Sequence, residues 1–132
     1  MIVDSSALIA ILKRETQWST FSRALDAAKF PCISAANYLE SSIVVDGWRN
    51  PILSREFDEL ILRFNIQIEP VTAEQARIAR QAYRDYGRGS GHAANLNFGD
   101  CFSYALARAK REPILFKGDD FIHTDLRSAI QP

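Results

Sequence analysis

Five acidic residues stand at positions from which their carboxylates can act on a common ligand. Asp4 follows the apolar segment "MIV", and the pair Asp119 and Asp120 follows the apolar segment "PILF". Asp100 opens the helical pattern "DCFSYALA", and Glu40 lies inside another helical pattern, "AANYLESSIVV". Carboxylates that meet in one place bind a hard cation or accept protons, so this set indicates metal-assisted or acid–base chemistry.

Each acid taken alone also has a purely structural explanation. Asp4 and Asp100 can cap the helices that follow them, because Asp is among the best N-cap residues. Glu40 can extend from the edge of its helix face into solvent. Asp119 and Asp120 can turn the chain after the preceding glycine. Only the whole set favours a site, in which acids from both halves of the chain converge at one edge of a sheet.

Four carboxylates gathered in one pocket would repel one another strongly. At an effective dielectric constant near 20, each pair costs roughly 2–4 kcal/mol at separations of about 4–8 Å. Shared protons or a divalent cation must offset this repulsion, and a ligand set made of oxygen atoms selects Mg²⁺ or Mn²⁺. The two histidines, His92 and His123, are too few and too far from the acids in the sequence to indicate zinc.

Short apolar strands and amphipathic helices alternate along the chain and must position these acids. Ser34 is placed to cap the helix that contains Glu40, and Thr72 with Gln75 forms a capping box. The stretch 87–99 is the one long irregular segment and contains four glycines. The predicted strands span 1–3, 30–34, 66–71 and 113–116, and the predicted helices span 7–15, 18–28, 35–48, 52–64, 73–86, 100–111 and 126–130.

This alternation predicts an α/β fold with a mainly parallel sheet, in a single domain that covers residues 1–132. Ligands of such sheets bind at the carboxyl ends of the strands. Asp4 and the acids near residue 120 follow predicted strands, so we expect them at that edge.

Composition restricts the setting in which the protein works. Sixteen basic residues balance sixteen acidic ones, so the net charge does not by itself indicate a nucleic-acid ligand. Cys32 and Cys101 form no CxxC motif, which fits a reducing compartment. The N-terminus has no basic leader before an apolar stretch, and no apolar run approaches the roughly 20 residues of a membrane span. We therefore expect a cytoplasmic protein that does not associate with membranes.

Four stretches in order along the chain resemble the PIN-domain ribonucleases, and within them the VapC toxins of type II toxin–antitoxin systems. They are "MIVDSSALIAIL", "ISAANYLES", "NFGDCFSYALA" and "ILFKGDDFIHTD". The resemblance implies a three-layer α/β/α PIN-like domain. It also implies that the protein is a toxin that hydrolyses RNA phosphodiester bonds with the help of Mg²⁺ or Mn²⁺.

The resemblance also implies roles for particular residues. Asp4 and Asp100 match the metal-binding carboxylates of the family, and Glu40 matches the acid that helps to hold the metal, directly or through water. The family pattern G-x-D-F selects Asp120 as the fourth acid, with Asp119 as the alternative. Ser6 matches a hydroxyl that hydrogen-bonds within the cluster. Ser5 departs from the family, in which Thr is more usual at this position.

Basic residues near the expected cleft are candidates for contacts with RNA phosphates. These are Arg84, Arg88, His92 and Lys117, and the alternative for each of them is an ordinary solvated position. The resemblance to the PIN-domain ribonucleases implies that a cation bound by the acids makes the local charge positive, so that the acidic cleft can bind RNA.

The resemblance implies protein partners as well. We expect a cognate VapB-type antitoxin, which in this family often places an Arg among the acids, and a homodimer that becomes a heterotetramer or larger with the antitoxin. The apolar segments "WSTF" and "ILSREFDELILRF" can supply a dimer seam, an antitoxin groove or simply core.

Two other classes of function compete with the nuclease: an aspartate-based phosphatase or phosphoryl-acceptor domain, and a non-catalytic interaction domain. An aspartate-based phosphatase of the haloacid-dehalogenase type needs a second Asp two residues after the first, and Ser6 occupies that place. A receiver-like phosphoryl-acceptor domain needs an Asp after the third strand, which here ends in Glu69 and Pro70. A non-catalytic interaction domain of the same fold would be favoured by an incomplete set of acids, and the set is complete.

Overall fold

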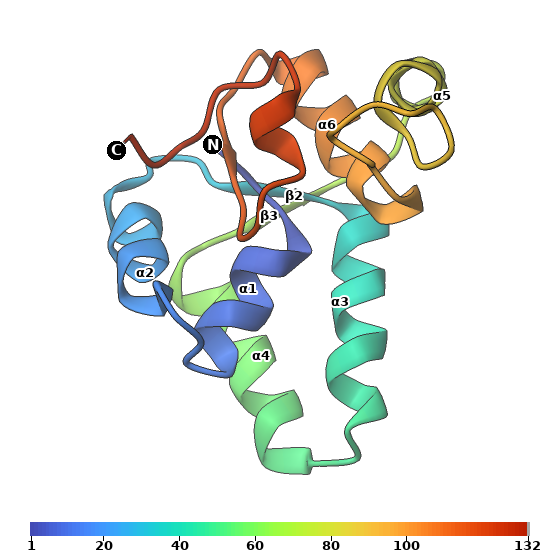
Figure 1. The fold of residues 1–132 in the computed structure, drawn as a ribbon. Coiled ribbons are helices and arrows are strands. Elements are labelled where there is room, and N and C mark those ends of the chain that lie inside the picture. Colours follow the sequence, from blue (N-terminus) through green and yellow to red (C-terminus); the bar gives the residue numbers. More distant parts are fainter. Residues whose placement is uncertain (132) are drawn as a thin grey trace.

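The computed structural model describes residues 1–131, which form a four-stranded parallel sheet covered by helices on both faces (Figure 1). The strand order is β3-β2-β1-β4, so β1 lies in the centre of the sheet beside β2 and β4. Ile2 pairs with both Cys32 and Ile114, and Cys32 pairs with Gln67. The strands are β1 (Ile2–Val3), β2 (Cys32–Ser34), β3 (Gln67–Glu69) and β4 (Ile114–Leu115).

Two separate cores hold the helices against the two faces of the sheet. Neighbouring residues of a strand point to opposite faces. Both faces of β1 and β4 are buried, so these two strands are apolar, whereas β3 at the edge is polar and largely exposed. Val3, Ile33 and Leu115 belong to one core, and Ile2, Cys32 and Ile114 to the other. The helices are α1 (Ser5–Leu12), α2 (Trp18–Ala27), α3 (Ala35–Gly47), α4 (Pro51–Arg63), α5 (Ala73–Tyr86) and α6 (Phe98–Lys110).

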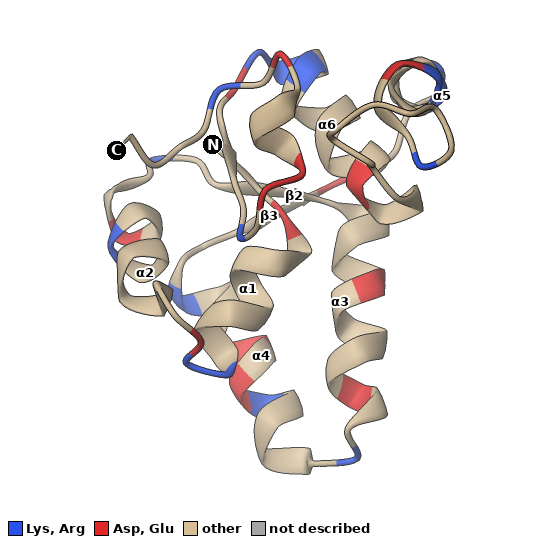
Figure 2. Cartoon of the chain, in the orientation of Figure 1, with Lys and Arg blue, Asp and Glu red and all other residues tan. Residues whose placement is uncertain are grey.

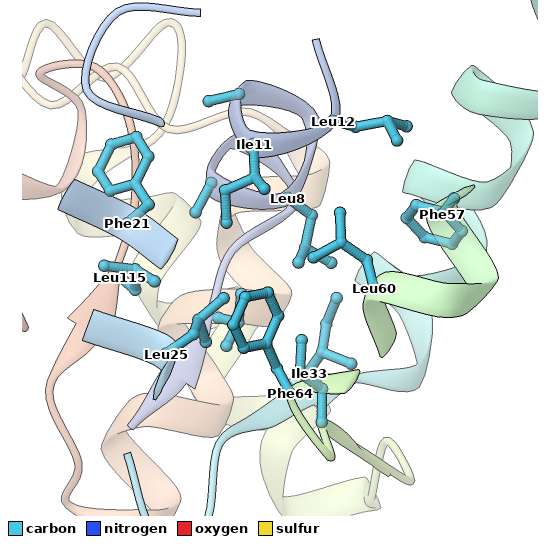
Figure 3. Close-up of a cluster of buried hydrophobic side chains, with 14 of the residues drawn as sticks. Leu8, Ile11, Leu12, Phe21, Leu25, Ile33, Phe57, Leu60, Phe64 and Leu115 are labelled. Atoms are coloured by element: carbon cyan, nitrogen blue, oxygen red, sulfur yellow. The ribbon is translucent and has the colours of Figure 1, made fainter. Parts of the chain in front are cut away.

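The first core joins α1, α2, α3 and α4, and the second joins α5 and α6. Figure 3 shows side chains of α1, including Leu8, packed among Phe21 of α2 and Leu60 of α4. The predicted apolar faces of "WSTF" and "ILSREFDELILRF" therefore contribute Phe21, Phe57 and Leu60 to the core. Together the two cores give the three-layer α/β/α arrangement that the sequence predicted.

Helices α3 and α4 form an antiparallel pair that extends beyond the sheet (Figure 1). The turn between them ends at Asn50, whose side chain caps α4, and Pro51 occupies the first turn, where its missing N–H costs nothing. Ser34 caps α3, as the sequence predicted. Thr72 caps α5 by accepting from the backbone N–H of Gln75, which is one of the two hydrogen bonds of the predicted capping box.

Two predicted features are wrong. Helix α6 begins at Phe98, because Asn97 is its N-cap, and Asp100 is the third residue of the first turn rather than the cap. The predicted helix at 126–130 does not form. A short 3₁₀ helix spans Phe121–His123 instead, and Ser128 forms a β-bridge with Ile114. The segment thus supplies hydrogen bonds to the exposed edge of β4, which a helix would leave unpaired.

Among residues 1–131, every helix is too short or too polar to traverse a lipid bilayer.

Candidate active site

Asp4, Glu40 and Asp100 line one cleft at the carboxyl edge of the sheet, with a volume of about 510 Å³. The cleft is bounded by the start of α1, the middle of α3, the start of α6 and the loop after β4. Figure 2 shows acidic positions on these elements around a common centre. Residues separated by 96 positions in the sequence therefore meet, because β1 and β2 are parallel neighbours and α6 packs against both.

Asp4 is the most firmly held of the three carboxylates. It follows β1 directly and caps α1, and its side chain is only 4% exposed. Its Oδ2 atom accepts hydrogen bonds from the backbone N–H of Ser6 at 3.0 Å and from the Ser6 hydroxyl at 2.6 Å. Its Oδ1 atom accepts from the Ser103 hydroxyl at 2.5 Å. Capping and membership of the cleft are thus not alternatives, since one side chain does both.

Ser6 connects Asp4 to the loop that follows the edge strand β4. Its Oγ atom accepts a hydrogen bond from the backbone N–H of Lys117 at 3.0 Å while its proton goes to Asp4. The backbone N–H of Asp4 in turn donates to the carbonyl of Leu115 at 2.9 Å. The loop after β4 is therefore tied to the first carboxylate.

A buried network of polar side chains holds Asp4 in place, and it was not predicted from the sequence. Asn37 and Ser103 are both 0% exposed. The Asn37 Nδ2 atom donates to the carbonyl of Gly99 at 2.9 Å, and its Oδ1 atom lies 3.0 Å from the Ser103 hydroxyl that also donates to Asp4. No buried side-chain nitrogen or oxygen atom within residues 1–131 lacks a partner.

A signal for this network does exist in the sequence. Asn37 precedes Glu40 by one helical turn, and Ser103 follows Asp100 by one turn, so each lies on the acid-bearing side of its helix. A polar residue on a face that is otherwise buried must have a partner, which points to a site rather than to plain core.

Glu40 reaches the cleft from the exposed side of α3. Its Oε1 atom accepts a hydrogen bond from the Ser5 hydroxyl at 3.0 Å. The carboxylate lies directly against Gly99, where any Cβ atom would collide with it. A side chain at position 99, in the first turn of α6, would therefore displace the Glu40 carboxylate from its present place.

Asp100 is held by the capping box of α6. Its Oδ2 atom accepts from the backbone N–H of Asn97 at 3.0 Å, and its own N–H donates to the Asn97 side chain at 2.8 Å. Burial raises the pKa of Asp100 from 3.8 to about 7, against the lowering effect of the Asn97 hydrogen bond, and the charges of Asp4, Asp120 and Glu40 raise it further. The acids therefore interact electrostatically in the folded protein.

The fourth acid of the set lies at the margin. Asp119 and Asp120 are both exposed, and neither lines the cleft. The charge of Asp120 nevertheless contributes to the raised pKa of Asp100.

Comparison with known proteins assigns the family. The PIN domain family model matches residues 1–126. Over 130 residues the chain is 55% identical to ribonuclease VapC28 of Mycobacterium tuberculosis, covering 98% of each chain. It is 50% identical over 129 residues to ribonuclease VapC42 of the same species, again covering 98% of each. The chain belongs to the VapC ribonucleases of the PIN-domain family.

Solved structures agree with this fold. The crystal structure of Mycobacterium tuberculosis VapC20, described as a sarcin–ricin loop cleaving toxin, matches with a TM-score of 0.75 at 19% identity and covers 99% of this chain and 98% of VapC20. A toxin–antitoxin complex from Klebsiella pneumoniae matches with a TM-score of 0.66 at 16% identity, over 91% of this chain and 88% of that one. At these identities the likeness shows the fold, and the closer sequence relatives show the family.

The basic residues of this VapC-family chain divide between the cleft and other surfaces. Lys117 lines the cleft, and its ammonium group pairs with the carboxylate of Glu15 at its rim. Arg88 lines a separate hollow. Arg84 and His92 are exposed and do not line the cleft, and the His92 ring packs edge-on against Tyr86 with 4.9 Å between ring centres. The structure thus brings only Lys117 to the acids.

The chemistry of the cleft matches a hard cation. Its polar lining consists of carboxylates, hydroxyls, one amide and one ammonium group, with no imidazole or thiol. Within residues 1–131, no three acidic, histidine or cysteine side chains come together closely enough to form a ready-made metal site. The cleft therefore contains the oxygen ligands that a hard cation prefers, but these ligands are not close enough together to coordinate one ion.

The raised pKa of Asp100 makes the stability of the metal-free VapC-family domain depend on pH. Between about pH 4 and pH 7 the folded protein holds a proton that the unfolded chain has released, so stability falls as the pH rises through this window. Below it both states are protonated, and above it both are ionised. The full shift corresponds to roughly 4 kcal/mol, and solvent screening of the partly exposed Asp100 reduces this to about 1–2 kcal/mol.

Urea unfolding in chelator at pH 5 and pH 8 checks this, with Asp100→Asn as the reference. The variant should gain stability relative to the natural chain as the pH rises, and the gain should level off above pH 7 to 8. A stability difference that does not change with pH would contradict the assigned interactions.

Proposed function

We propose that this chain is the toxin of a toxin–antitoxin pair and cuts RNA as a metal-dependent endoribonuclease. One observation carries the proposal: Asp4, Glu40 and Asp100 line a single cleft at the carboxyl edge of the sheet, in a chain that belongs to the VapC ribonucleases. The substrate is an RNA phosphodiester bond bound across that cleft.

Asp4, Glu40 and Asp100 would hold Mg²⁺ or Mn²⁺, with Asp120 as the fourth acid and Asp119 as its alternative. When bound, the ion supplies a water of lowered pKa and neutralises charge on the phosphate. Burial, together with the charges of the neighbouring acids, raises the pKa of Asp100, and this supports the assignment, because a bound cation would favour the ionised carboxylate.

The residues around the ion would have distinct tasks. Asp4, held at both oxygens, is a rigid anchor. Glu40 is exposed and held at Oε1 by Ser5, so its other oxygen can accept the proton of the attacking water, with Asp120 as the alternative acceptor. Ser6 keeps Asp4 in place. Lys117 would exchange Glu15 for a phosphate oxygen of RNA bound in the cleft, since its ammonium group lies at the cleft rim.

The proposal includes protein partners and a cellular place. A VapB-type antitoxin would silence the cleft, and a guanidinium group inserted among the acids would offset their repulsion as the cation does. Leu39, Ile43 and Val44 of α3 are exposed apolar side chains close to Glu40 and offer such a partner a surface. The toxin would act in the cytoplasm as a homodimer, and as a heterotetramer or larger assembly with the antitoxin.

Metal removal and return test the proposal. Purified protein, freed of any partner, should leave a mixed-sequence single-stranded RNA intact in chelator and cut it when Mg²⁺ or Mn²⁺ is added. The same ions should raise the melting temperature of the natural chain and not that of Asp4→Asn, because binding to the folded state alone stabilises it. Equal cutting with and without the metal would overturn the mechanism.

A further inference from the structure

A second hollow opens between α5 and α6, beside the carboxylate cleft. It has a volume of about 760 Å³, and we name it the α5–α6 hollow. Its walls are mostly apolar and aromatic, with Ala79 and Tyr83 contributed by α5 and with Phe98, Cys101 and Phe102 contributed by α6. In Figure 1 the two helices lie side by side, with the loop 87–97 beside them.

We infer that the α5–α6 hollow binds a nucleobase of single-stranded RNA next to the phosphate that is cut. This inference rests on the proposed function and adds to it a subsite for the base. Single-stranded RNA is recognised by splaying a base onto aromatic side chains while basic side chains hold the backbone. The hollow provides both kinds of group within reach of the acids.

The aromatic surface is exposed and held in place. Phe98 is 78% exposed in the first turn of α6, and its ring meets that of Phe102 edge to face with 4.9 Å between ring centres. Tyr83 is half exposed, and its ring lies against Gly87, where a Cβ atom would collide with it. Two exposed aromatic rings are therefore accessible to a flat ligand.

Two arginines give the hollow a positive rim. Arg80 and Arg88 both line it, and within residues 1–131 neither forms an ion pair with a carboxylate. This positive rim lies beside a cleft that is lined mainly by carboxylates. The RNA phosphates that flank the bond that is cut would therefore bind the arginines of the rim rather than the acidic cleft. This charge complementarity favours a polyanion carrying flat apolar groups over a second copy of the chain.

Asn97 connects the two cavities, since it lines both of them. Its Oδ1 atom accepts from the backbone N–H of Asp100 at 2.8 Å, which directs the amide. Its Nδ2 group donates to no acceptor within residues 1–131 and is free to donate to a ribose, base or phosphate oxygen. One nucleotide can thus have its phosphate at the cleft and its base in the hollow.

RNA affinity tests the inference without requiring cleavage. In the Asp4→Asn background, fluorescence anisotropy with a labelled single-stranded oligonucleotide would measure Kd for Phe98→Ala and for Leu62→Ala. Leu62 is a matched control, because it is 79% exposed on α4 and lines neither cavity. We expect Phe98→Ala to weaken binding about tenfold or more, and Leu62→Ala to leave it unchanged.

Competition by inorganic polyphosphate separates base binding from charge. Phe98→Ala should leave the affinity for polyphosphate unchanged. Arg88→Ala should weaken the binding of both RNA and polyphosphate and lower the salt dependence of RNA binding. Equal RNA affinity of the Phe98 and Leu62 variants, or an equal loss for RNA and polyphosphate, would overturn the inference.

Two further outcomes have separate meanings. If sedimentation shows that Phe98→Ala dissociates a dimer while RNA affinity is unchanged, the hollow is a contact between copies and the inference is wrong. If the natural chain cuts no RNA with metal present, the proposed function fails, and the binding measurement in the Asp4→Asn background still decides the fate of the hollow.

Discussion

Asp100→Asn is expected to lower RNA cleavage by roughly three orders of magnitude or more without loss of the fold. Asn keeps the shape of the side chain and can still accept the Asn97 backbone hydrogen bond through its amide oxygen. It removes the charge that a divalent cation needs. The reaction should therefore fail at the chemical step, with kcat falling far more than KM changes.

The same substitution should raise thermal stability in chelator at neutral pH. Burial and the charges of Asp4, Asp120 and Glu40 oppose ionisation of Asp100, and Asn has no charge to oppose. Rapid-quench cleavage assays and thermal melts measure the two effects on the same sample. Loss of an activity together with a gain of stability distinguishes a functional carboxylate from a structural one.

Asp58→Asn is the matched control for this prediction. Asp58 is an exposed acid on α4 and does not line the cleft. Its substitution should change neither cleavage nor stability measurably. An Asp100→Asn protein that cuts RNA within tenfold of the Asp58→Asn protein would refute the role assigned to Asp100.

Asn37→Ala is expected to destabilise the fold by about 2–4 kcal/mol, which lowers the melting temperature by roughly 10 °C. The substitution leaves the Gly99 carbonyl without its donor and opens a cavity beside Ser103, in a position that is 0% exposed. Cleavage should also fall, because Ser103 and the start of α6 lose the group that aligns them with Asp4.

Ser42→Ala provides the comparison on the same helix. The Ser42 hydroxyl donates to the carbonyl of Tyr38 at 2.6 Å, a local bond within α3 that does not reach the cleft. We expect a loss of less than about 1 kcal/mol and no change in cleavage. Similar losses for the two variants would mean that the Asn37 network contributes nothing special, and urea unfolding decides between these results.

Helix boundaries illustrate where sequence patterns are reliable. Ser34 and Thr72 were identified as caps from residue type and spacing, and both accept backbone hydrogen bonds in the structure. Asp100 was misplaced at the cap because Asn97 is an equally good cap residue three positions earlier. The predicted helix at 126–130 failed because the edge of β4 offers that segment hydrogen bonds that no local pattern reveals.

The positions of the basic residues also depended on the tertiary structure. All four candidates are ordinary solvated residues by sequence, and only the packing of the loop after β4 brings Lys117 to the acids. Arg88 lies at the α5–α6 hollow, a cavity that no sequence pattern indicated. Side chains on different elements approach one another through the crossing of helices and strands, which depends on contacts far apart in the chain.

The sequence by itself determined the α/β class, most of the elements, the family resemblance and the acids, because hydrophobic period, capping and motif order are properties of neighbouring residues. Tertiary structure alone decided that Asp4, Glu40 and Asp100 share a cleft and that Asn37 and Ser103 lie beneath it. It also decided that Gly99 makes room for Glu40. These features depend on parallel strand pairing and on the packing of α3 against α6, which bring together residues about 60 to 100 positions apart.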